Sequence, residues 1–256
     1  MTTLLDGKVA VVTGSGAGLG EAIARRLAAE GARVVVSDIN AEAARTVADS
    51  IEGAIAVTTD VRDETQVQEL IGRAQEAFGG LHIMIPNAGI GLVEPLAGMS
   101  YADWRRTTSV NLDGVFLSIR YAAPVIAESG GGSIVTISSV TATAGSPLLA
   151  PYAASKAAVR NLTQTAAVEF RPAGVRVNAV LPGFIDTEMV VKAAPDFEAA
   201  LGLPAGGFDG LIEQKQGRYG TPEEVAAAVL FFASEQSSWC TGSSLVLDGG
   251  LVGSLL

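Results

Sequence analysis

Hydrophobic residues follow two spacings along the chain: short continuous apolar runs, and longer stretches in which apolar positions recur every three or four residues. The run 9–12 is continuous and β-branched, which predicts a strand buried on both faces of a parallel sheet. From about Gly18 the spacing becomes helical, and Gly31 ends that helix. A second apolar run then ends at Asp38. The chain therefore opens as strand, glycine-rich turn, helix and strand.

The same alternation continues toward the C-terminus. Further strands are predicted at residues 54–60, 81–86, 132–139, 175–180 and 243–250, and further helices at 41–51, 67–78, 101–127, 152–170 and 222–234. Seven strands alternating with helices predict an α/β fold, a Rossmann-type doubly wound parallel sheet with helices on both faces. No proline-rich or like-charge linker interrupts the pattern, so residues 1–256 are expected to form a single domain.

One segment breaks the regular pattern. Between Pro182 and Tyr219, prolines and glycines are scattered among apolar residues, with Pro195, Gly202 and Pro204 among them. Long irregular segments of this kind often cover active sites. We expect a substrate loop or lid at about residues 184–219.

The first strand-to-helix turn carries Gly14, Gly18 and Gly20, with the spacing GxxxGxG rather than GxGxxG. Glycines let backbone N–H groups approach a pyrophosphate, and the helix N-terminus adds a partial positive charge. The same glycines also suit a tight turn that needs them only for its backbone angles. Asp38 favours a dinucleotide site, because a carboxylate at the end of the second strand can accept hydrogen bonds from the adenosine ribose.

Composition narrows the possible partners. The chain has 256 residues, 48% of them hydrophobic, and a formal net charge of −10, which argues against nucleic acid or an anionic membrane as a partner. The N-terminus lacks the pattern of a signal peptide, and the apolar run 225–233 is too short to span a bilayer, so a cytoplasmic protein is expected. Cys240 and His82 are the only residues of their types. We interpret both as structural and predict no metal site.

Two further features carry chemistry. Tyr152 and Lys156 lie four residues apart, on one face of a predicted helix. An ammonium beside a phenol favours the phenolate, so Tyr152 could act as a general acid or base near neutral pH. Ser139 ends a buried strand and could hold a substrate oxygen. Taken singly, the Tyr–Lys spacing also fits an ordinary solvated helix start, and Ser138 and Ser139 fit a turn or cap.

Taken together, these features resemble the short-chain dehydrogenase/reductase family from end to end. The resemblance rests on TGSGAGLG (13–20), the pair Asp60 and Val61, PNAG (86–89) with Pro86 in place of the family's first Asn, Asn111 in VNLDGVF, YAASK (152–156) and LPGFIDTEM (181–189). It implies a catalytic tetrad of Asn111, Ser139, Tyr152 and Lys156. It also implies cofactor binding by Gly14, Gly18, Leu19, Gly20, Asp38, Ile39, Asp60, Val61, Asn87, Ala88, Gly89, Tyr152, Lys156, Pro182, Gly183, Ile185 and Thr187.

The resemblance also implies a mechanism. A hydride passes between a secondary alcohol or ketone and the nicotinamide, while Tyr152 exchanges the hydroxyl proton. Lys156 would bind the nicotinamide ribose, and Asn111 would order a water in a proton relay. Ser139 would orient the substrate oxygen. Ile185 and Thr187 would hold the nicotinamide carboxamide.

The predicted cofactor is NAD, because a 2′-phosphate would be repelled by Asp38 and no basic residue follows directly. The segments expected to line the substrate pocket are nearly free of basic residues, which favours a neutral alcohol or ketone. They are residues 140–149, residues 89–93, and the lid around Phe197, Leu201, Leu203, Phe208 and Leu211. Small apolar residues surround most of the helix 152–170, which favours a homotetramer. Two alternatives remain: a 3-oxoacyl-thioester (acyl carrier protein) reductase, and a catalytically idle NAD-binding regulator.

Overall fold

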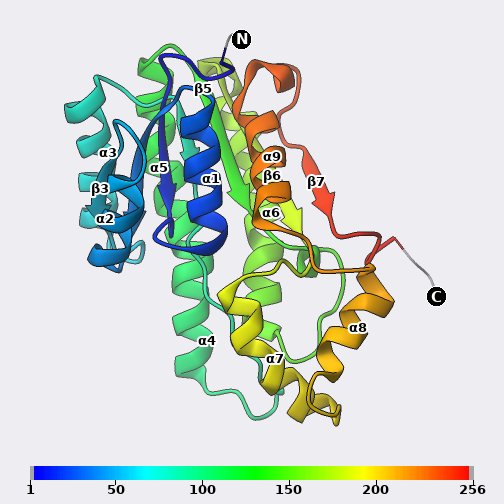
Figure 1. The fold of residues 1–256 in the computed structure, drawn as a ribbon. Helices are drawn as coiled ribbons and strands as arrows, with labels where there is room; N and C mark the ends of the chain where they lie inside the picture. The colour runs from blue at the N-terminus through cyan, green and yellow to red at the C-terminus, as the bar shows by residue number, and fades with distance from the viewer. Residues whose placement is uncertain (1–2, 254–256) are drawn as a thin grey trace.

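The apolar runs pair side by side as one parallel sheet. The computed structural model describes residues 3–253, in which seven strands lie in the order β3-β2-β1-β4-β5-β6-β7 (Figure 1). The strands are β1 (Val9–Thr13), β2 (Arg33–Asp38), β3 (Ile55–Thr58), β4 (Ile83–Ile85), β5 (Gly132–Ile137), β6 (Val175–Pro182) and β7 (Ser244–Leu247). The predicted Rossmann-type α/β fold in a single domain is confirmed.

The chain builds the sheet outward from β1 in both directions. After β3 the chain returns to add β4 on the other side of β1, so Val11 pairs with Val35 on β2 and with Met84 on β4. Parallel sheets of this kind bind ligands in the crevice at the carboxyl ends of the strands where the order reverses. The turns after β1 and β4 meet at that point.

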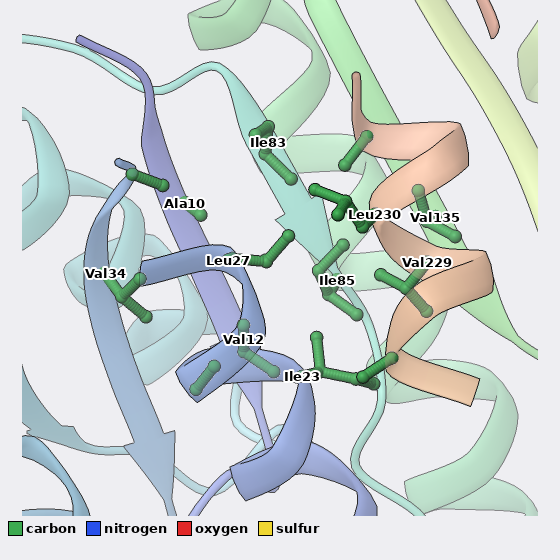
Figure 2. Close-up of a cluster of buried hydrophobic side chains, with 14 of the residues drawn as sticks. Ala10, Val12, Ile23, Leu27, Val34, Ile83, Ile85, Val135, Val229 and Leu230 are labelled. Carbon is green, nitrogen blue, oxygen red and sulfur yellow. The ribbon is translucent and has the colours of Figure 1, made fainter. Parts of the chain in front are cut away.

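Helices cover both faces of the sheet. The helices α1 (Gly18–Ala29), α2 (Ala41–Asp49) and α9 (Pro222–Ala233) cover one face, and α3 (Glu64–Phe78), α5 (Gly114–Glu128) and α6 (Ala150–Phe170) cover the other. A hydrophobic core lies on each face of the sheet, and alternate residues of β1 pack into the two cores. Ala10 and Val12 pack toward α1 and α9 (Figure 2), whereas Val9 and Val11 pack toward the helices on the opposite face. Each large aliphatic side chain buried in this way contributes about 1.5–3 kcal/mol.

Caps at two helices fix where the chain leaves the sheet. The side chain of Asn40 accepts hydrogen bonds from the backbone N–H groups of Glu42 and Ala43 and so begins α2. Thr221 and Glu224 form a reciprocal capping box at the start of α9. Short 3₁₀ turns complete the connections at Val140–Ala142 (η2), Arg171–Ala173 (η3) and Glu235–Ser237 (η4).

The predicted helix 101–127 is interrupted. It consists of α4 (Tyr101–Thr108), a π-helical turn η1 (Ser109–Asp113) and α5. A π turn widens the helix locally and is frequent at functional sites. The whole segment Tyr101–Glu128 is long and apolar enough to cross a membrane by length and composition, but half of its most apolar window is buried inside the fold.

The segment 184–219 is mostly helical, so the expectation of an irregular loop is wrong. It contains α7 (Glu188–Leu201) and α8 (Gly207–Gln216), which lie beyond the carboxyl ends of the strands (Figure 1). Pro195 is accommodated within α7, and Gly202 ends that helix with a φ of 67°. Phe197, Phe208 and Ile212 give the two helices a small core of their own. A lid role for this helical segment stays a prediction.

Candidate active site

One pocket runs along the carboxyl ends of the central strands. Its volume is about 520 Å³, and it is lined by every residue that the sequence predicted to bind the cofactor, Gly14, Asp38, Ile185 and Thr187 among them. Tyr152 and Lys156 line the same pocket, whereas Asn111 and Ser139 are not among its lining residues. The sheet therefore brings together residues from six separate segments of the chain.

Asn87 fixes the glycine turn by hydrogen bonds, and the turn leaves open space at Gly18. The Asn87 side-chain amide donates to the carbonyls of Thr13 and Gly14, 2.9 and 3.0 Å away. A Cβ at Gly20 would lie 2.1 Å from the Gly14 oxygen, so this position has room for glycine only. At Gly18, with a φ of 57°, a Cβ would meet only the Thr187 side chain, 3.9 Å away. This open cradle fits a pyrophosphate at the start of α1.

The two oxygens of Asp38 are both bonded to backbone. Oδ2 accepts from the Gly16 N–H and Oδ1 from the Asn40 N–H, each at 2.9 Å. These bonds fix the carboxylate between the glycine turn and α2. Since a carboxylate oxygen has more than one lone pair, both oxygens retain acceptor capacity toward a ribose.

Asp60 has a partner that the sequence analysis missed. The Arg62 guanidinium donates to both carboxylate oxygens, with distances of 2.9 Å from Nε to Oδ1 and 2.6 Å from Nη2 to Oδ2. The hydrogen bond from Arg62 lowers the pKa of Asp60. Arg62 itself lines the pocket beside Asp38. Its position two residues after Asp60, which the resemblance assigned to cofactor binding, was the available signal.

Lys156 is buried beside the Tyr152 ring. It is 3% exposed, its Nζ lies 5.5 Å from the centre of that ring, and the same atom donates to the Ile137 carbonyl at 2.8 Å. Burial lowers the pKa of Lys156 to about 8. Burial also raises the pKa of Tyr152, against the effect of a side-chain hydrogen bond with Ser139. Burial thus opposes the lowering of the Tyr152 pKa that the sequence predicts.

The two serines after β5 have different roles. Ser138 donates to the backbone carbonyl of Lys156 at 2.8 Å and so ties the strand end to α6. The Ser139 hydroxyl accepts from the Thr141 N–H at 3.2 Å, which caps η2, and it also bonds to Tyr152. Ser139 is thus both a cap and a partner of the tyrosine.

Asn111 lies in the π-helical turn and is fully buried. Its amide bonds both backbone groups of Ile90, with distances of 2.8 Å to the N–H and 2.9 Å to the carbonyl. A Cβ at Gly89 would lie 3.3 Å from Asn111 Oδ1 and 3.6 Å from Lys156 Nζ. Asn111 and Lys156 therefore approach the same small space beneath the turn after β4.

The structure adds lining residues that the sequence did not assign to the cofactor. They are Ala17, Thr59, Arg62, Ile90, Arg106, Val110, Ile137, Ser138, Glu188, Met189 and Val190. Glu188 and Met189 belong to the first turn of α7, which was predicted to be irregular. The Thr59 hydroxyl is buried and has no hydrogen-bond partner among the described residues.

The residues expected to line a substrate pocket divide into two groups. Phe197 and Phe208 stack on each other with ring centres 4.7 Å apart, and Val93 and Leu148 pack against their cluster. Leu201 is 47% exposed and does not belong to this cluster, and its place at a substrate pocket stays a prediction. The aromatic residues of the segment are thus engaged in holding α7 and α8 together.

Comparison with known proteins finds dehydrogenases and reductases that are similar to this chain. A family model described as "Enoyl-(Acyl carrier protein) reductase" matches residues 14–252. A cis-4-hydroxycyclohexanecarboxylate dehydrogenase of Sinomonas cyclohexanicum is 40% identical over 95% of this chain and 96% of its own. A cyclohexanol dehydrogenase of an Acinetobacter species is 38% identical over 97% and 96%. The crystal structure of a levodione reductase superimposes with a TM-score of 0.90 at 34% identity, covering 98% of this chain and 99% of the other.

Proposed function

Since the chain belongs to the short-chain dehydrogenase/reductase family, whose members are alcohol and ketone oxidoreductases with a nicotinamide cofactor, we propose that it oxidises a ring secondary alcohol with NAD, or reduces the corresponding ketone. The observation that carries this proposal is that Tyr152 and Lys156 line the same pocket as the glycine turn, with Ser139 acting on the pKa of Tyr152. A regulator that only binds the cofactor has no need of this group.

Each side chain has a role in the proposed reaction. The bound nicotinamide supplies the acceptor for the hydride, which leaves the carbinol carbon with its electron pair. Tyr152 takes the hydroxyl proton, and its hydrogen bond from Ser139 favours the phenolate that this step requires. Ser139 also orients the substrate oxygen. Asn111 and Lys156 approach one space behind the pocket, where they would hold the nicotinamide ribose and relay the proton.

The preference for NAD rests on Asp38. Its carboxylate is fixed by the N–H groups of Gly16 and Asn40, so it cannot turn away from a 2′-phosphate without losing both bonds. Repulsion between this carboxylate and a phosphate in contact costs several kcal/mol at an effective dielectric constant of about 20. Arg62 is engaged by Asp60, which reduces its capacity to offset that repulsion.

The experiment is a rate comparison with purified protein. We expect higher kcat/KM with NAD than with NADP, and higher kcat/KM for cyclohexanol or the methyl ester of 4-hydroxycyclohexanecarboxylate than for the free acid. Equal or higher kcat/KM with NADP would refute the predicted preference for NAD. A strong preference for the free acid would refute the prediction of a neutral substrate. Absence of turnover with any ring alcohol or ketone would favour the idle regulator.

A second candidate is a 3-oxoacyl-thioester reductase, because a 3-oxoacyl-[acyl-carrier-protein] reductase of Thermotoga maritima is 37% identical over 97% of this chain and 99% of its own. The helices α7 and α8 carry more acidic than basic residues, which opposes docking of an acidic carrier protein. We rank it second. Faster reduction of a 3-oxoacyl thioester than of any ring ketone would reverse this order.

A further inference from the structure

We propose that Gln216, outside the predicted site, is a positioning residue that holds the nicotinamide-side segment 183–187 in its binding geometry. This inference rests on the proposed function, since the segment matters for binding only if a nicotinamide lies against it. Gln216 is the last residue of α8 and is 5% exposed. It does not line the pocket.

The Gln216 amide makes three hydrogen bonds, all to backbone. Its Oε1 accepts from the Phe184 N–H at 2.9 Å, and its Nε2 donates to the Phe184 carbonyl at 2.7 Å and to the Arg218 carbonyl at 2.8 Å. The partners fix the orientation of the amide, because an N–H requires the oxygen and two carbonyls require the nitrogen. Only an uncharged amide offers one acceptor and two donors in this arrangement.

Phe184 connects the segment 183–187 to the helices α7 and α8. Its neighbours Gly183 and Ile185 line the pocket, whereas the Phe184 ring packs edge-on against Phe197 and Phe208, with ring centres 6.2 and 5.4 Å apart. The backbone of Phe184 therefore lies between the pocket and the helices α7 and α8. Bonds from Gln216 to that backbone set how far the pocket-lining neighbours project.

The contact between Gln216 and the segment is tight. A Cβ at Gly183 would lie 2.4 Å from Gln216 Oε1, so no larger residue fits beside the amide. A second support comes from Gly220, whose N–H donates to the Phe184 carbonyl at 3.0 Å and whose carbonyl accepts from Asp186 at 2.9 Å. Loss of the glutamine would leave the Phe184 carbonyl one partner and the Phe184 N–H none.

This arrangement predicts a selective effect on the nicotinamide half of the cofactor. In Gln216→Met, which keeps the length of the side chain but removes its hydrogen bonds, we expect affinity for NADH to fall about tenfold, the size usual for a buried donor that loses its partner. Affinity for ADP-ribose should stay within about twofold, because it lacks the nicotinamide ring that the segment is proposed to hold.

The control is Gln214→Met, which changes an exposed glutamine two residues earlier on the same helix. It should leave both affinities unchanged. The binding constants are measured by isothermal titration calorimetry, with the melting temperature recorded for each variant. If Gln216→Met weakened NADH and ADP-ribose equally, or neither, the positioning role would be refuted, and an equal loss accompanied by a lower melting temperature would indicate a general structural role.

A pH profile provides a second readout. In Gln216→Glu the ionised carboxylate keeps an acceptor for the Phe184 N–H but faces two carbonyls with no hydrogen to donate. Protonation restores a donor, so the loss of NADH affinity relative to the unmodified chain should shrink as pH falls from 8 to 6. A loss that is independent of pH would contradict the proposed hydrogen-bonding role.

Failure of the proposed function has a different signature. If the unmodified chain bound NADPH but not NADH, the predicted cofactor would be wrong, and the same comparison would be made with NADPH and 2′-phospho-ADP-ribose. The Gln216 proposal requires the nicotinamide-selective loss with whichever cofactor binds. An unselective result in that pair would overturn it as well.

Discussion

The Nζ atom of Lys156 lies 5.5 Å from the centre of the Tyr152 ring. Burial shifts the two groups in opposite directions, lowering the pKa of Lys156 to about 8 and raising the pKa of Tyr152 above its ordinary value of 10. Burial therefore disfavours the charged form of both groups, so a phenolate near neutral pH requires positive charge close to Tyr152.

Replacing Tyr152 by phenylalanine removes the proposed proton acceptor and little else. We expect kcat to fall by about 10²- to 10⁴-fold, the usual contribution of a general acid or base. Affinity for NADH should change less than twofold. Tyr101→Phe, at an exposed position on α4, is the control. A Tyr152→Phe variant with near-normal turnover would exclude the mechanism.

The lowered pKa of Lys156 makes stability depend on pH in a defined window. Between pH 8 and the ordinary lysine value of 10.5, the unfolded chain binds more protons at this position than the folded chain, so the free energy of unfolding rises with pH. The rise from this one residue is of the order of 3 kcal/mol. Below pH 8 its contribution is constant.

Urea unfolding at a series of pH values measures this rise as the difference between the unmodified chain and Lys156→Met. Carrying both through a Tyr152→Phe background removes the titration of the tyrosine. A difference that does not change between pH 8 and 10.5 would show that the lysine retains an ordinary pKa.

Asp38→Asn tests the basis of cofactor choice. The amide oxygen can still accept from the Gly16 or Asn40 N–H, so the turn is largely retained while the charge is removed. We expect the ratio of kcat/KM for NAD to that for NADP to fall at least about tenfold, since repulsion worth several kcal/mol is lost. Glu42→Gln, which removes an exposed charge nearby on α2, should leave the ratio unchanged.

The outward side of α6 leads us to expect a homotetramer. Val168 is 65% exposed there, and Ala154 and Ala157 are exposed along the same helix. Val168→Glu should shift the mass measured by light scattering toward smaller species without changing secondary structure. Val191→Glu, at a similarly exposed position (62%) on α7, should have no such effect. A monomeric mass for the unmodified chain at micromolar concentration would refute the assembly.

Much of the fold could be predicted because burial and backbone rules act locally. The strands follow from continuous apolar runs, and the caps at Asn40 and Thr221 follow from side chains that satisfy the first N–H groups of a helix. The π-helical turn at Asn111 could not be predicted in this way, because one extra residue in a turn barely alters the apolar spacing. The sequence pattern did not predict the helices α7 and α8, because Pro195 and several glycines interrupt the helical spacing of apolar residues.

The candidate site, like the fold, has features that the sequence predicts and features that it does not. The predicted cofactor residues follow the ends of strands, so topology alone brings them to one pocket. The pairing of Arg62 with Asp60 and the bonds of Gln216 depend on side-chain directions that sequence spacing does not specify. The raised pKa of Tyr152 depends on how deeply the whole group is buried, which is a property of the packed structure.

The helices α7 and α8 occupy one uninterrupted stretch of chain between β6 and α9, and no sheet pairing passes through them. We therefore expect that this stretch, treated as one cassette, could be exchanged between relatives without disturbing the sheet. Gln216 limits such exchange, because its bonds to Phe184 cross the junction of the cassette. A chimera that imports the stretch must also import a partner for the Phe184 backbone.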